Sequence, residues 1–180
     1  MSESNPILIK FYPENSKLIN YSFLPGLCLR MQNLFNHKDY QLLLVRINAI
    51  SPVSERLWGK MEAHQMIIHL KDQLDIALGN MSAAAQGPFL LRTIAGKLLA
   101  LYVIPWRKGK EITPREMNPQ LKGIVITDFE SDKHLLLIRL QEFSKANCFA
   151  DHPFFGRLNK SQWGRLAWKH TNHHLLQFGA

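Results

Sequence analysis

The sequence predicts an all-α protein, a bundle of four long helices with an extra helix inside one long crossover connection. Three observations predict this fold. Apolar residues recur at helical spacing in several long stretches, capping residues stand at the ends of these stretches, and strand-like patterns are confined to residues 1–30 and 123–126. The chain has 180 residues, of which 46% are hydrophobic and 20% charged, and this is enough to bury one substantial core.

Residues 1–30 are expected to form an irregular extension or a short hairpin, and residues 31–180 the helical domain. Prolines and a glycine interrupt the short apolar runs of the extension, so no helical period survives there. The regular pattern begins after Met31, which makes Met31 a candidate for the functional start of the protein.

Two helices are expected in the first part of the domain. One covers residues 38–50, with Asn36 as its cap, and the other covers residues 58–78 and stops at Gly79. The apolar stripe consists of Tyr40, Leu43, Leu44 and Ile47 in the first helix and of Met66, Ile67, Leu70, Leu74 and Ala77 in the second.

The crossover follows. Residues 89–104 are expected to be helical, and a long polar connection with three prolines comes after them. A capping box of Thr127 and Glu130 then predicts a helix that reaches about Lys145. The apolar stripe of this helix is Phe129, Leu136, Leu140 and Phe143.

The last helix is expected to begin near Ser161 and to end at Gly179. Asn159 is its cap, and Gln162 stands three residues further on. The sequence contains no internal repeat and no low-complexity tract.

The chain is basic, with a net charge of +8 and a pI near 9.7. The densest basic group is residues 107–110, and no nucleic-acid-binding motif accompanies it, so a solvated basic surface is favoured and no nucleic-acid partner is expected.

Residues 89–106 look at first like a membrane span. Arg92 and Lys97 interrupt them and Pro105 closes them, which favours a buried or interfacial helix and no membrane span.

A cytoplasmic location is expected. The N-terminus lacks the basic region and the apolar run of a secretory signal. Cys28 and Cys148 stand in no metal-binding or redox spacing, which fits a reducing compartment, and we interpret both as ordinary residues that are buried.

His170 and His174 are the most informative residues of the chain. Four residues apart on a helix, they stack on one face and are close enough to share a metal ion. At about 100° per residue they fall in the same arc as Trp163, Leu166 and Ala167. Two imidazoles would therefore point into the interior, where a polar group needs a partner, and a metal ion would satisfy both.

A third ligand is expected from another helix, because two ligands rarely suffice for a functional metal site. Residues 58–78 offer His64 and His69, which are about 140° apart around the helix and so cannot both face one ion. Each lies to one side of the main apolar arc, and the helical wheel does not choose between them.

Several motifs resemble the DinB-like superfamily, and in particular an uncharacterised branch of it, domain of unknown function 1569. The resemblance covers residues 31–180. It rests on the run Leu57-Trp58-Gly59-Lys60-Met61 with Gln65-Met66 and His69-Leu70, on His152-Pro153-Phe154-Phe155-Gly156, on Trp163-Gly164-Arg165-Leu166, and on His170 and His174 followed by Leu175, Gln177, Phe178 and Gly179.

The resemblance implies a four-helix bundle with a three-histidine metal site. Its ligands by position are His69, His170 and His174, which leaves His64 outside the set. His173 also falls outside, at the edge of the arc, where contact with solvent or a neighbouring helix is expected. The alternative is that these are core histidines joined only by hydrogen bonds. We favour the metal site, because two histidines share one apolar face and a third matches them.

Other polar and aromatic residues carry less weight. Gln177 and Asp72 are candidates for fixing the orientation of the histidine rings by hydrogen bonds, with a surface position as the alternative for each. Trp163, Trp168 and Phe178 are interpreted as core residues, and the four tryptophans as a set are given no functional role.

Three neutral nitrogen ligands leave open positions on a divalent ion, where water or a thiol can be activated. Relatives in the superfamily include thiol-dependent transferases and isomerases, so the resemblance implies a metal-dependent enzyme that transfers a small thiol, or water, to a small electrophilic substrate. Zinc or nickel suits the ligands best, and manganese or iron is compatible with them.

Two other classes of function remain open. One is a non-catalytic, metal-stabilised bundle that binds a small molecule or a partner protein. The other is association with a membrane or a nucleic acid through the positive charge and residues 89–106, which ranks last because a charge excess without a motif is weak support. A homodimer is compatible with a bundle of this size.

Overall fold

The computed structural model describes residues 30–106, 108 and 128–180. Within these residues the prediction of an all-α fold is confirmed, and residues from Met31 onward form one compact unit. The expectations for the N-terminal extension, Cys28, the strand at 123–126 and most of the proline-containing connection fall outside the described residues.

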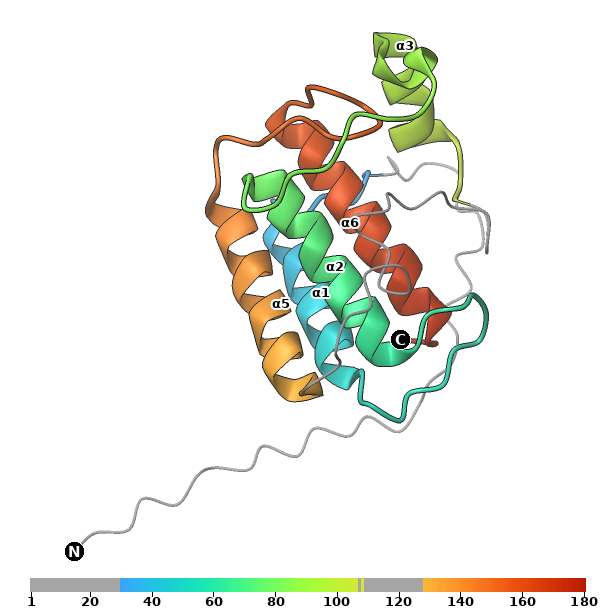
Figure 1. Ribbon diagram of the computed structural model, residues 1–180, viewed down its shortest axis with the longest axis vertical. Coiled ribbons are helices and arrows are strands. Elements are labelled where there is room, and N and C mark those ends of the chain that lie inside the picture. Colours follow the sequence, from blue (N-terminus) through green and yellow to red (C-terminus); the bar gives the residue numbers. More distant parts are fainter. Residues whose placement is uncertain (1–29, 107, 109–127) are drawn as a thin grey trace, which may run out of the picture. The chain divides into compact units, whose positions relative to one another are not determined.

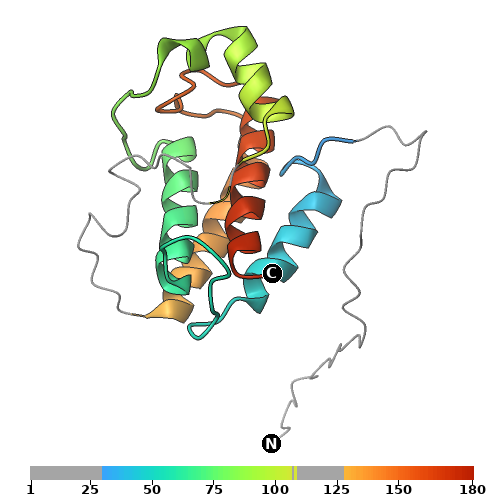
Figure 2. The same ribbon diagram turned by 90° about the vertical axis from the view of Figure 1, so that its right-hand side faces the viewer.

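Four long helices lie side by side (Figures 1 and 2). They are α1 (His37–Ala49), α2 (Ala63–Leu78), α5 (Phe129–Lys145) and α6 (Lys160–Gln177). Helices α1 and α2 each pack against both α5 and α6. The predicted apolar stripes meet between them, and the fully buried side chains there include Leu43, Ile47, Met66, Leu70, Leu74, Leu136, Leu140, Phe143 and Trp163.

Local capping explains where most of these helices begin. Asn36 accepts hydrogen bonds from the first turn of α1, and Asn159 forms a reciprocal capping box with Gln162 at the start of α6, both as predicted. The cap of α5 differs from the prediction. Asp128, not Thr127, is the N-cap residue, and its carboxylate accepts a hydrogen bond from the backbone N–H of Ser131.

Helix α2 is shorter than predicted. It begins at Ala63 rather than at residue 58, because Gly59 has a φ of 90° and turns the chain out of any helical path. Glu62 and Gln65 then form a capping box that starts the helix. The residues before Glu62 make a turn, and this turn contacts the end of α6.

The single helix predicted over residues 89–104 is wrong in its continuity. The structure has a short 3₁₀ helix η1 (Phe89–Arg92), then α3 (Ile94–Leu98) and a π-helical turn η2 (Leu99–Val103). Thr93 causes the break, because its backbone is extended and its hydroxyl caps the next turn by accepting from the N–H of Gly96. Within the described ranges, no helix combines the length and the apolar character needed to cross a bilayer.

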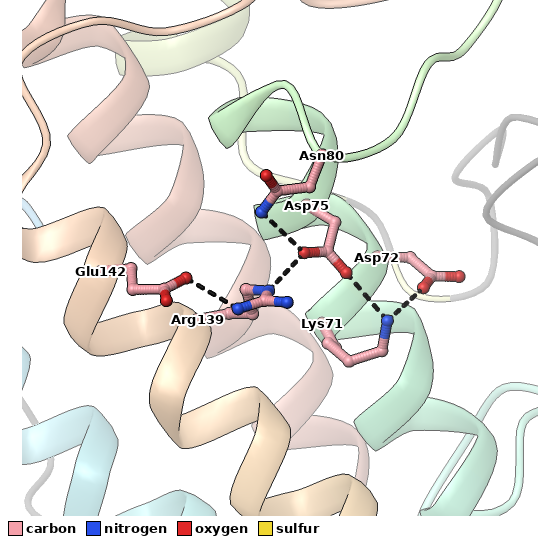
Figure 3. Close-up of polar contacts among 6 residues, drawn as sticks. All are labelled: Lys71, Asp72, Asp75, Asn80, Arg139 and Glu142. Carbon is pink, nitrogen blue, oxygen red and sulfur yellow. Dashed lines mark hydrogen bonds and ion pairs between the residues drawn. The ribbon is translucent and has the colours of Figure 1, made fainter.

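A polar network joins α2 to α5 (Figure 3). The carboxylate of Asp75 accepts hydrogen bonds from Lys71 Nζ at 2.9 Å, Arg139 Nε at 2.6 Å and Asn80 Nδ2 at 3.3 Å. Burial alone would raise the pKa of Asp75, but these hydrogen bonds and the charge of Lys71 hold it below its usual value. The network therefore fixes how α2 lies on α5, with its ionised carboxylate at the centre.

The loop between α5 and α6 is built around His152. Its Nδ1 accepts hydrogen bonds from the backbone N–H groups of Phe154 at 3.1 Å and Phe155 at 3.3 Å, and its ring packs against Trp163. Burial, followed by the nearby charge of Arg92, lowers the pKa of His152 to about 3. The ring is therefore neutral in the folded protein at any pH near neutrality.

We expect His152 to make the protein sensitive to mild acid. The unfolded chain binds a proton at the ordinary histidine pKa of 6.5, whereas the folded chain does so only near 3, so stability is complete above pH 6.5 and falls as the pH drops below it. This residue alone accounts for a loss of about 2 kcal/mol between pH 7 and pH 5. Urea unfolding at several pH values measures this loss in wild type and in His152→Asn. The asparagine side chain keeps a hydrogen-bond acceptor but cannot titrate. Parallel pH profiles for the two proteins would contradict the prediction.

The prediction that Cys148 is buried is wrong, because the residue is exposed. It lies in the loop between α5 and α6, after the last turn of α5, where the chain runs over the surface.

Candidate metal centre

The structure brings together the three histidines selected from the sequence. His69 lies on α2, and His170 and His174 lie on consecutive turns of α6. The Nε2 atom of His170 is 3.0 Å from Nε2 of His69 and 3.2 Å from Nε2 of His174. One nitrogen of each ring lies within 4.8 Å of the other two, and all three side chains are buried.

The local sequence explains this convergence. The four-residue spacing places His170 and His174 on one face of α6, and Trp163, Leu166 and Ala167 on that helix are buried with them. Helix α2 packs against α6 with the His69 side inward. The face of α6 that buries its apolar residues thus also carries two imidazoles to the third.

Gln177 holds the ring of His174. The Nδ1 atom of His174 donates a hydrogen bond to Oε1 of Gln177 at 2.7 Å, which leaves the lone pair of Nε2 directed at the other two histidines. Gln177 is buried, not on the surface. The other candidate, Asp72, accepts a hydrogen bond from Lys71 Nζ at 3.0 Å (Figure 3), and its role beside the histidines stays a prediction.

The turn before α2, at residues 57–59, contacts Gln177 and positions it. The backbone N–H of Leu57 donates to the backbone carbonyl of Gln177 at 2.6 Å. A Cβ atom on Gly59 would lie only 2.8 Å from the side-chain nitrogen of Gln177, so glycine lets this turn approach the amide closely. Residues 57–59 therefore hold Gln177 where it accepts the hydrogen bond from His174, which a helix over these residues would not do.

The rings of His170 and His174 are neutral. Burial, followed by the neighbouring histidines, places the pKa of His170 well below its usual value. The pKa of His174 is also well below its usual value, first through burial and then through His69, and the hydrogen bond to Gln177 opposes this shift only in part. Neutral imidazoles are the form in which histidine binds metal ions.

Hydrogen bonds among the rings leave one nitrogen unsatisfied. Nε2 of His174 is a lone-pair atom, and Nδ1 of His170 is buried without a hydrogen-bond partner among the described residues. If His170 carries its proton on Nε2, its Nδ1 lone pair has no donor. If the proton is on Nδ1, that N–H has no acceptor and two lone pairs face each other across 3.2 Å. A cation that accepts the three Nε2 lone pairs removes the repulsion between the facing lone pairs. The residues therefore fit a divalent metal ion.

The two histidines outside the set lie elsewhere. Nε2 of His64 is 2.7 Å from a carboxylate oxygen of Asp132, so this residue links α2 to α5. His173 is buried, so of the two contacts expected for it, solvent or a neighbouring helix, the contact with solvent is not seen. Its ring lies 4.8 Å from Trp58 and 5.5 Å from Trp106, centroid to centroid.

Trp58 and Trp106 are site residues that the sequence analysis did not select. The ring of Trp106 also lies 5.6 Å from that of His170, so the two indoles form an aromatic wall beside the three histidines. Trp58 stands within the motif that carried the family resemblance, which was a usable signal. No sequence pattern pointed to Trp106.

The comparisons with known proteins give one match. A family model described as protein of unknown function (DUF1569) matches residues 47–180, which is well over half of the chain. No curated protein and no solved structure matches the chain. The matched range contains the three histidines, Gln177 and both tryptophans of the aromatic wall. The chain therefore belongs to the DUF1569 family of proteins of unknown function.

Proposed function

We propose that His69, His170 and His174 bind a divalent metal ion through their Nε2 atoms. We further propose that the chain is a metal-dependent enzyme of the DinB-like superfamily with a small-molecule substrate. The observation that carries this proposal is the convergence of three buried imidazoles from two helices, at 3.0 Å and 3.2 Å between neighbouring Nε2 atoms. Core histidines joined only by hydrogen bonds would leave fewer unsatisfied nitrogens than this arrangement does.

The donor set favours a catalytic over a purely structural site. Among the described residues no fourth histidine, cysteine or carboxylate joins the three histidines, and structural sites are normally closed by a fourth protein ligand. The bound ion would supply a Lewis acid that activates a small thiol or a water molecule for transfer to an electrophilic substrate. Zinc or nickel fits three imidazoles best, with manganese or iron as further choices.

The protein's own residues would orient this site. Gln177 holds the His174 ring in the tautomer that offers Nε2, and the turn at residues 57–59 holds Gln177. The ring of Trp106 packs edge-on against His170, and Trp58 and Trp106 both pack against His173, so these aromatic rings would restrict the access of water. Exclusion of water strengthens every electrostatic interaction inside such a site.

Elemental analysis tests the proposal. Protein purified without an affinity tag is expected to carry close to one equivalent of a divalent transition metal, and His69→Ala and His174→Ala are expected to lose it, because two remaining imidazoles bind weakly. The measurement is the metal-to-protein ratio after dialysis.

Two matched controls separate the site from other histidines. His64→Ala removes a buried histidine of the same helix as His69, and His134→Ala removes an exposed one, and both are expected to keep the metal. Equal and negligible metal in wild type and all variants would remove the basis for any catalytic role.

A non-catalytic, metal-stabilised bundle is the second candidate, and the near-complete burial of the three rings favours it. Cobalt-substituted protein distinguishes the two. An open site is expected to change its visible spectrum on addition of azide or a small thiol, whereas a closed structural site gives no response.

A further inference from the structure

Residues 89–104, which we call the crossover segment, expose an unusual concentration of large apolar side chains. Half of the exposed large apolar residues in the described part of the chain lie in these sixteen residues. Their exposed fractions run from 46% for Ile104 to 79% for Phe89. The full set is Phe89, Leu90, Ile94, Leu98, Leu99, Val103 and Ile104. A concentration of exposed large apolar side chains of this kind is typical of an interaction site.

The outward direction of these side chains is fixed from the inside. Leu101 is fully buried, and both cationic side chains of the segment donate hydrogen bonds to backbone carbonyls of the loop between α5 and α6. Arg92 Nη2 donates to the carbonyl of Pro153 at 2.8 Å, and Lys97 Nζ donates to the carbonyl of Arg157 at 2.7 Å.

Helix α6 holds the other end of the segment. Lys169 Nζ donates to the carbonyls of Ala100 at 2.7 Å and Ile104 at 2.6 Å, and Arg165 Nε donates to the carbonyl of Leu101 at 3.1 Å. The segment lies at the end of the helical core where α6 begins (Figures 1 and 2). The segment is therefore docked through its polar groups and presents its apolar groups outward.

The charge of the crossover segment and of its neighbours along the chain has one sign. The sequence contains no aspartate or glutamate between residues 76 and 110, and the basic residues of this stretch that the structure describes are Arg92, Lys97 and Lys108. Among the described residues, no carboxylate forms an ion pair with Arg92, Lys97 or Lys108. A partner that fits this surface must be apolar inside and negatively charged around it.

We propose that the crossover segment binds the surface of an anionic lipid bilayer. Its apolar side chains would lie in the interface between headgroups and acyl chains, and the positive charge of Arg92, Lys97 and Lys108, which no carboxylate compensates, would attract the anionic headgroups. A second copy of the chain fits less well. A two-fold contact through this surface would bring two acid-free, basic segments together with no opposite charge to compensate them.

Flotation with lipid vesicles tests the proposal on the full chain. Wild type is expected to float with vesicles of phosphatidylcholine and phosphatidylglycerol in equal parts, to stay behind with phosphatidylcholine alone, and to be released by high salt. Ile94→Glu is expected to weaken the partition about tenfold or more, because it places a carboxylate in the apolar contact.

Val53→Glu is the matched control. Val53 is 84% exposed, lies outside the segment and receives the same charge, so its partition should change much less than that of Ile94→Glu. Circular dichroism should show both variants folded, since the replaced side chains are exposed. Three outcomes would each overturn the proposal: no flotation of wild type, equal losses in the two variants, or a dimer without flotation that Ile94→Glu alone dissociates.

Discussion

Gly164→Ala is expected to destabilise the protein by about 3 kcal/mol or more. A Cβ atom at this position of α6 would overlap Oδ1 of Asn33 and a ring carbon of Phe35, and it would lie 2.8 Å from Cε2 of Phe35. Neither group can move aside easily. Asn33 Oδ1 accepts from the backbone N–H of Phe35, and the Phe35 ring stacks on Phe143 in the core at 5.3 Å.

The sign of this effect is informative, because an alanine in a helix is intrinsically favoured over glycine by about 1 kcal/mol. The steric overlap must exceed that gain. Urea unfolding measures the change, and Ser161→Ala, on an exposed position of the same helix, is the control and should shift stability by no more than about 0.5 kcal/mol. An unchanged or higher stability of Gly164→Ala would show that residues 33–35 do not cross α6 as closely as described.

Features set by short-range interactions were predictable from the sequence. The Asn159–Gln162 capping box and the four-residue spacing of His170 and His174 both belong to α6 alone, so the start of the helix and the shared face of the two rings follow from local geometry. The apolar stripes of α1 and α5 were predictable for the same reason.

Features that depend on how one helix lies on another were not. The wheel of α2 did not choose between His64 and His69, because the choice depends on which neighbour each face meets. The pairing of His64 with Asp132 on α5 leaves His69 on the side of α6. Family resemblance supplied the information that spacing lacked.

Turns and all-round apolar stretches were the other limit. The helical period runs back toward Trp58, but the backbone of Gly59 ends it and makes a turn that holds Gln177. In the crossover segment apolar residues occur on every side, so the sequence could not say which of them face the protein and which face outward.

His170→Leu is expected to abolish the stabilisation of the protein by metal while leaving the metal-free protein about as stable as before. In wild type, a metal ion at about a thousand times its dissociation constant should add about 4 kcal/mol of stability. For a domain of this size, that corresponds to a rise in Tm of roughly 8–16 °C. Leucine cannot bind the ion, so this rise should vanish.

The stability of the metal-free protein, in contrast, should change little in His170→Leu. The His170 ring carries a buried Nδ1 without a partner among the described residues, and its Nε2 faces two other ring nitrogens at 3.0 Å and 3.2 Å. Leucine removes the unsatisfied Nδ1 of His170, and this gain offsets the loss of the contacts that its Nε2 makes with His69 and His174, so the stability of the metal-free protein should stay close to that of wild type.

His64→Leu gives the reverse pattern and is therefore the decisive comparison. It breaks the 2.7 Å contact with Asp132, which should lower the metal-free stability by about 1–3 kcal/mol, but it should retain the full rise in Tm on addition of metal. Thermal unfolding of both variants, with and without zinc, gives four numbers. Core histidines that only join helices predict a loss of metal-free stability in both variants and no metal effect in either. A metal centre predicts opposite results for the two variants. His64→Leu should lower the metal-free stability and keep the rise in Tm with metal, whereas His170→Leu should keep the metal-free stability and lose that rise.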